Sequence, residues 1–138
     1  MAVERSIITP PGLAKPRGYN YGVKVQGGST LYIAGQVAFD GGGKVVGPGD
    51  IVRQFEQALA NLRRVLEAGE ALPQDVVKLN IYTADMAAYK ANLSGIGRAY
   101  RAVFGHHYPA MTVVEVKSLY DDGILLEIEG VAVTAGGA

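Results

Sequence analysis

The chain has 138 residues, and its 13 basic and 13 acidic side chains give a formal net charge of zero. This length fits one domain with a buried core. Balanced charge argues against nucleic acid as the main partner, because phosphate binding needs a basic surface. The chain has no cysteine, which excludes disulfides, thiolate metal sites and cysteine nucleophiles. No apolar run reaches membrane-spanning length and no signal peptide is visible, so we expect a cytoplasmic protein without a membrane contact.

The first third of the chain predicts short strands separated by glycine and proline turns. Strands are expected over residues 6–9, 21–26 and 29–39. Gly27-Gly28 is predicted to be the two-residue turn of a hairpin, because glycine accepts the positive φ that such turns require. Residues 44–46 are expected to form a short strand that closes the hairpin.

The rest of the chain predicts two amphipathic helices and three more strands. Asp50 is a suitable N-cap for a helix whose apolar side chains recur at spacings of three and four, and Gly69 is its expected end. Asp85 is the expected cap of the second helix. In chain order, the elements after the first helix are a strand over 75–82, a helix over 86–104 and strands over 108–116 and 124–133.

The order of these elements predicts an α+β domain over residues 1–138. The simplest packing is a single mixed sheet of about six strands, with both helices on one face. The other face then has no helix to cover it. We expect this face to carry Met111, Val113 and Val131, and therefore to associate with other copies of the chain.

Two acidic residues stand two positions apart in the last strand. Glu127 and Glu129 must point to the same side of the sheet, since side chains alternate along a strand. A like-charged pair on a buried face is costly unless it is partnered. This side should therefore be exposed to water, paired or functional, and a structural ion pair is the alternative to a functional role.

The last quarter of the chain carries a recognisable order of residues. Pro109-Ala110 precedes Val114-Glu115-Val116, and Glu127-Ile128-Glu129 follows after a short turn. This order resembles the C-terminal signature of the reactive intermediate deaminase family (Rid or YjgF, also endoribonuclease L-PSP-like), and earlier segments agree with it. The resemblance implies a two-layer fold like that of chorismate mutase. It also implies a homotrimer with small-molecule pockets between subunits, and no cofactor.

The resemblance also implies roles for particular residues. In the family, an arginine after the Pro-Ala pair binds the substrate carboxylate, and a glutamate of the last strand positions a water that attacks an imine carbon. Glu127 matches this glutamate. Gly35-Gln36 matches the backbone amide region of the site. Tyr19 is the best match for a tyrosine of the N-terminal loop, with Tyr21 as the alternative.

The sequence departs from the family pattern at the arginine. Met111 stands in its place, Val113 occupies a position that is often cysteine, and Gly97 falls where the helix otherwise offers asparagine. Methionine has no charge with which to bind a carboxylate. We therefore expect either a larger or less acidic substrate, or another cation in the arginine's role. The candidate cations are Arg17, Arg101 and Lys117.

The functional prediction is a Rid-like deaminase or hydrolase that acts on an imine or enamine of a small metabolite, with Glu127 assisting water. An unsaturated amino acid such as 2-aminomuconate is one possible substrate. The alternative is a catalytically silent trimer that holds an apolar metabolite against Met111 and Val113. RNA cleavage is disfavoured by the zero net charge. A metal site at His106-His107 is not expected, since no set of further ligands lies at suitable spacing.

Overall fold

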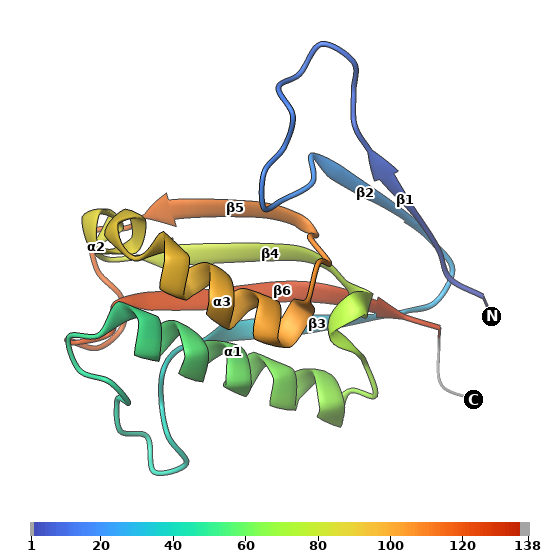
Figure 1. The fold of residues 1–138 in the computed structure, drawn as a ribbon. Helices are drawn as coiled ribbons and strands as arrows, with labels where there is room; N and C mark the ends of the chain where they lie inside the picture. Colours follow the sequence, from blue (N-terminus) through green and yellow to red (C-terminus); the bar gives the residue numbers. More distant parts are fainter. Residues whose placement is uncertain (1, 136–138) are drawn as a thin grey trace.

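Helices α1 (Ile51–Ala68) and α3 (Leu93–Phe104) cover one face of a four-stranded mixed sheet in the computed structural model (Figure 1). The strand order is β3 (Ser29–Gln36), β6 (Leu126–Thr134), β4 (Val76–Thr83) and β5 (Ala110–Glu115). The β4–β5 pair is parallel and the other pairs are antiparallel. The structure describes residues 2–135, so Met1 and 136–138 of the predicted domain lie outside the described residues.

The six strands of the described residues divide between two sheets. The α+β class is therefore confirmed, and the prediction of a single six-stranded sheet is corrected. In the described part of the chain, strands β1 (Glu4–Ile8) and β2 (Gly22–Gln26) pair only with each other. Figure 1 shows this β1–β2 hairpin extending away from the main sheet. Its base is held to the main domain by Arg5, whose guanidinium donates to the Val133 carbonyl and forms an ion pair with Asp75 at 2.7 Å.

The predicted hairpin turn at Gly27-Gly28 is wrong. Both glycines have positive φ, 78° and 80°, but the strands on either side of them belong to different sheets, and β3 pairs with β6. A Cβ on Gly28 would lie 2.2 Å from the Thr134 carbonyl oxygen. Glycine is therefore needed where the chain passes close to β6, because local turn chemistry fixes φ but does not choose the partner strand.

Residues 37–47 form a tight loop after β3, which ends at Gln36 and not at Phe39 as predicted. The predicted short strand over 44–46 is reduced to an isolated bridge between Phe39 and Val45. Asp40 accepts from Lys44 through its side chain at 2.9 Å, which stabilises the turn. This small hairpin is thus closed by 44–46, but it is not part of either sheet.

Both helix caps were predicted correctly. Asp50 Oδ1 accepts from the Arg53 amide at 3.0 Å, and Asp85 Oδ1 accepts from the Ala88 amide at the same distance. The second helix is interrupted at Asn92 into α2 (Met86–Ala91) and α3. Within residues 2–135, none of the helices combines the length and the apolar character that crossing a bilayer would require.

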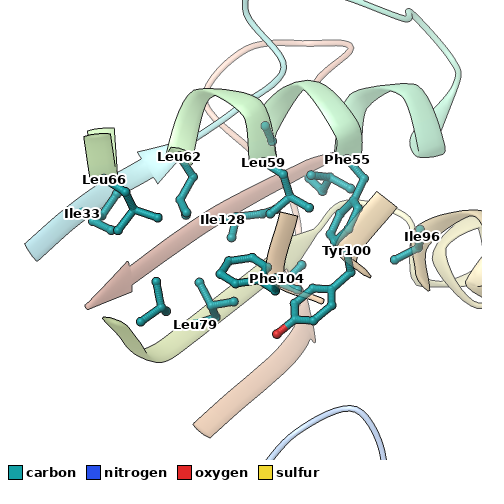
Figure 2. Packing of buried hydrophobic residues seen from close by; sticks show 14 of the residues in the cluster. Ile33, Phe55, Leu59, Leu62, Leu66, Leu79, Ile96, Tyr100, Phe104 and Ile128 are labelled. Atoms are coloured by element: carbon teal, nitrogen blue, oxygen red, sulfur yellow. The ribbon is translucent and has the colours of Figure 1, made fainter. Parts of the chain in front are cut away.

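The core lies between the helices and the sheet (Figure 2). Side chains from α1 interleave with those from α3 and with alternate residues of β4 and β6. Each fully buried side chain of this kind contributes about 1.5–3 kcal/mol relative to its exposed state. The buried residues labelled in Figure 2 include Phe55, Leu59, Leu62, Leu66, Leu79, Phe104 and Ile128.

The predicted facing of Met111 and Val113 is wrong. In the parallel β4–β5 pair, Leu79 is opposite Met111 and Ile81 is opposite Val113. Opposed residues on neighbouring strands project to the same side of a sheet, so both side chains face the helices and pack against the core. Val131 lies on the helix-free face as predicted.

The helix-free face is largely polar on β4 and β6 and more apolar at its edges. Tyr32 on β3 is 78% exposed and Val114 on β5 is 40% exposed. The cross-strand pairs between these edges are Tyr32 with Val131, Asn80 with Glu129 and Tyr82 with Glu127.

Candidate active site

The structure brings three of the predicted site residues together at a bulge in β3. The β3–β6 register shifts between Ile33 and Gln36, and Gln36 pairs with Ile128. This shift places Gly35 against Glu127, and a Cβ on Gly35 would lie 1.8 Å from Glu127 Oε2. The carboxylate therefore occupies the space that any other side chain at position 35 would need.

The two acidic residues of β6 have different surroundings. Glu129 Oε1 accepts from the Tyr82 hydroxyl at 2.5 Å and from Asn80 Nδ2 at 3.3 Å. This hydrogen bond to Glu129 is the main cause that raises the pKa of Tyr82 above its ordinary value. Glu127 is half-buried and has neither a hydrogen bond nor an ion pair among residues 2–135. Glu129 thus has structural partners, whereas the Glu127 carboxylate is available to a ligand.

A cavity of about 170 Å³ lies beside Met111, on the helix side of the sheet. Phe55, Ile81 and Ile96 supply apolar walls from α1, β4 and α3. Of the described residues that line it, Arg101 is the single charged one. All three candidate cations are exposed, and Arg17 and Lys117 do not line this cavity. Val113 does not line it either and packs against the core.

The N-terminal loop is anchored to the residues that immediately precede β5, close to Met111 in the sequence. Asn20 donates from its backbone amide to the Pro109 carbonyl at 3.0 Å and from Nδ2 to the Tyr108 carbonyl at 2.5 Å. Tyr19 and Tyr21 flank this anchor, with their rings edge to face at 5.5 Å. Sequence reasoning missed Asn20. Its position between Tyr19 and Tyr21 in a loop could have indicated this role, because an asparagine side chain can donate hydrogen bonds to backbone carbonyls.

The predicted site residues therefore form two clusters on opposite faces of one sheet. Glu127 lies on the helix-free side with Gly35 against its carboxylate, whereas Gln36 is opposite Ile128, whose side chain is buried on the helix side. Met111 lies on the helix side with the cavity, and the loop of Tyr19 is anchored at the start of the same strand, β5. Within one chain, the sheet separates the carboxylate from the cavity.

Neither His106 nor His107 lines the cavity beside Met111. His107 Nε2 is hydrogen-bonded to the Val76 carbonyl at 2.7 Å, which gives it a role in packing the loop after α3. Among the described residues, no group of three or more histidine, aspartate or glutamate side chains is arranged to hold a metal ion.

Comparison with known proteins identifies the family. The family model described as Endoribonuclease L-PSP matches residues 13–134. A RutC family protein of Pyrococcus horikoshii is 34% identical over 128 residues, which cover 93% of this chain and 97% of the relative. A 2-iminobutanoate/2-iminopropanoate deaminase of Mus musculus is 34% identical over 113 residues, covering 82% and 80%.

The solved structures agree with the sequence comparison. The crystal structure of YyfB from Yersinia pestis, a Rid family protein of unknown function, is similar with a TM-score of 0.84 and 35% identity. The similarity covers 94% of this chain and 98% of YyfB. The chain therefore belongs to the Rid (YjgF) family, which confirms the resemblance noted in the sequence.

Proposed function

We propose that the protein is an imine or enamine deaminase in which Glu127 activates water. The observation that carries this proposal is the half-buried Glu127 carboxylate, which has no hydrogen bond or ion pair among residues 2–135 and lies against Gly35. The similarity to relatives named 2-iminobutanoate/2-iminopropanoate deaminase, from Mus musculus and Capra hircus, supports imine deamination at the level of the family.

The reaction needs one base and no cofactor. Glu127 takes a proton from water while the water oxygen bonds to the imine carbon, and the C=N bond becomes a single bond. Glu127 then returns the proton to the nitrogen, which gives a carbinolamine. It next takes the hydroxyl proton and passes it to the nitrogen, so that the C–N bond breaks, ammonia leaves and the carbonyl forms. An enamine substrate first tautomerises to the imine, and the same steps follow.

A site that uses both Glu127 and the cavity beside Met111 requires two copies of the chain. The two clusters lie on opposite faces of the sheet, so Glu127 of one copy must approach the cavity of another. The exposed Tyr32 and Val114 on the helix-free face favour such association. The proposal keeps the homotrimer that the family resemblance implies.

A binding protein without catalysis is the second candidate. The observation that favours it is Met111, which stands in the place of the arginine that binds the substrate carboxylate in the family. Methionine offers an apolar contact there and no charge for a small imino acid. Such a protein would gain thermal stability with a ligand and turn nothing over.

Ammonia release separates the two functions. The native protein would be supplied with a small 2-imino acid generated in situ and, separately, with a larger enamine acid. The deaminase proposal expects release from at least one of them and its loss in Glu127→Gln, at an unchanged melting temperature. Release that persists in Glu127→Gln would overturn the role of Glu127. Absence of release with both substrates would favour the binding protein.

A further inference from the structure

We propose that Arg101 on α3 is the anion-binding residue of the cavity beside Met111, and that this cavity takes a carboxylate joined to an apolar body. The claim that the bound carboxylate belongs to an imine or enamine substrate rests on the proposed function. The claim that the cavity binds a carboxylate does not. Three observations support the proposal: the composition of the cavity, the position of the guanidinium, and the lack of a hydrogen bond or ion pair to it from residues 2–135.

The cavity suits an apolar body of limited size. An apolar cavity of about 150 Å³ holds benzene, and this one measures about 170 Å³. Its walls include Phe55, Ile81 and Met111. Met111 cannot hold an anion, so any negative charge on the ligand depends on a residue outside β5.

The absence of a side chain at Gly97 leaves room for the Arg101 guanidinium at the cavity. The two residues are four apart on α3 and therefore share one side of the helix. A Cβ on Gly97 would lie 3.0 Å from a terminal nitrogen of Arg101, so the guanidinium rests beside the bare backbone of Gly97. Both residues line the cavity. A larger side chain at position 97 would push the guanidinium away.

The guanidinium of Arg101 is free to bind a ligand. It has neither a hydrogen bond nor an ion pair in the part of the chain that the structure describes. Arg98, on the same helix, instead donates to Ser94 Oγ at 2.9 Å. Arg101 is exposed at the edge of the cavity. The planar fork of an arginine binds a carboxylate through two parallel hydrogen bonds.

Tyr89 adds a second polar group to the cavity. It is 8% exposed, and its hydroxyl has no hydrogen-bond partner among residues 2–135. Since no fully buried side-chain polar atom of these residues lacks a partner, this hydroxyl must be reachable from solvent. Burial raises the pKa of Tyr89 to about 12, so the hydroxyl keeps its proton at neutral pH and can donate to a ligand.

Binding of inert probes tests the proposal without catalysis. Hexanoate combines the apolar body with a carboxylate, and hexanol has the same body without the charge. Isothermal titration of the native protein should detect hexanoate, and Arg101→Gln should weaken its binding roughly tenfold or more. Hexanol should bind both proteins equally. Arg98→Gln is the matched control, because it removes a charge from the same helix away from the cavity, and it should bind hexanoate like the native protein.

Two outcomes would overturn the role of Arg101. The first is no hexanoate binding by the native protein, and the second is equal binding by native protein and Arg101→Gln. Arg101→Lys should fall between native protein and Arg101→Gln, since it keeps the charge and loses the fork. Ammonia release by a native protein that does not bind hexanoate would refute this inference alone. Hexanoate binding without any ammonia release would instead refute the proposed deaminase.

Discussion

The Glu127 carboxylate lies against the bare α-carbon of Gly35, where a Cβ would sit 1.8 Å from Oε2. Gly35→Ala must therefore displace the carboxylate or distort the β3 bulge. We expect the variant to lose about 1–3 kcal/mol of unfolding free energy, as overpacked sites do, and to lose ammonia release. Chemical denaturation and the ammonia assay measure the two effects.

Gly41→Ala is the control for this substitution. No heavy atom lies within 4 Å of a Cβ on Gly41, so alanine there should change the unfolding free energy by at most about 0.5 kcal/mol. Equal stability and equal activity of Gly35→Ala and Gly41→Ala would show that the close approach of Gly35 to Glu127 has no consequence.

The buried Tyr89 predicts a loss of stability in alkaline solution. Burial raises its pKa from 10.0 to about 12, so the folded state holds a proton that the unfolded state releases above pH 10. The contribution of protonated Tyr89 to the unfolding free energy is fully present below pH 10 and is lost as the pH rises toward 12. Tyr89→Phe should therefore flatten the fall in unfolding free energy over this window, by about 2–3 kcal/mol.

Tyr120→Phe is the matched control for the alkaline experiment. Tyr120 is 95% exposed, so the variant should follow the native curve. The measurement is denaturant unfolding at intervals from pH 9 to pH 12. Identical curves for Tyr89→Phe and Tyr120→Phe would contradict the raised pKa of Tyr89.

Association through the helix-free face predicts that a charge at Tyr32 separates the copies. Tyr32 is 78% exposed in the single chain and pairs across the sheet with Val131, so Tyr32→Glu places a carboxylate in the interface without touching the core. Analytical ultracentrifugation should show the native oligomer converted to a smaller species with an unchanged circular dichroism spectrum. Leu72→Glu, at a residue 64% exposed beside the short 3-10 helix over 73–75, should leave the oligomer intact. A monomeric native protein would refute this association.

The sequence predicted the helices better than the strand partners. The caps at Asp50 and Asp85 are local interactions between a side chain and amides three residues on, so a single segment contains the whole signal. The partner of β3 is instead a strand almost a hundred residues away. Gly27-Gly28 has the positive φ expected from its turn chemistry, but only the approach to Thr134 on β6 explains why glycine is required there.

The sequence named candidate site residues, but their arrangement depends on the fold. Alternation along β5 puts Met111 and Val113 on one face, but the choice of face depends on the parallel pairing with Leu79 and Ile81. Likewise, Glu127 and Glu129 look equivalent along β6. Their difference comes from Tyr82 and Asn80 on the neighbouring strand, which bind only Glu129.

The choice among the candidate cations also required the fold. Arg17, Arg101 and Lys117 are separate in sequence, and nothing in their neighbours distinguishes them. The spacing of Gly97 and Arg101 on one side of α3 becomes meaningful only once β5 brings Met111 to the same cavity.

Mixed oligomers test the central claim, that Glu127 of one copy serves the cavity of another. Glu127→Gln removes the base, and Met111→Trp fills the cavity. Each variant alone should fold and release no ammonia. Coexpressed in equal amounts, they should recover about a quarter of native activity, because random assembly joins an intact carboxylate to an intact cavity at one site in four. No recovery in mixed oligomers verified by native mass spectrometry, or full activity of Met111→Trp alone, would contradict the shared site.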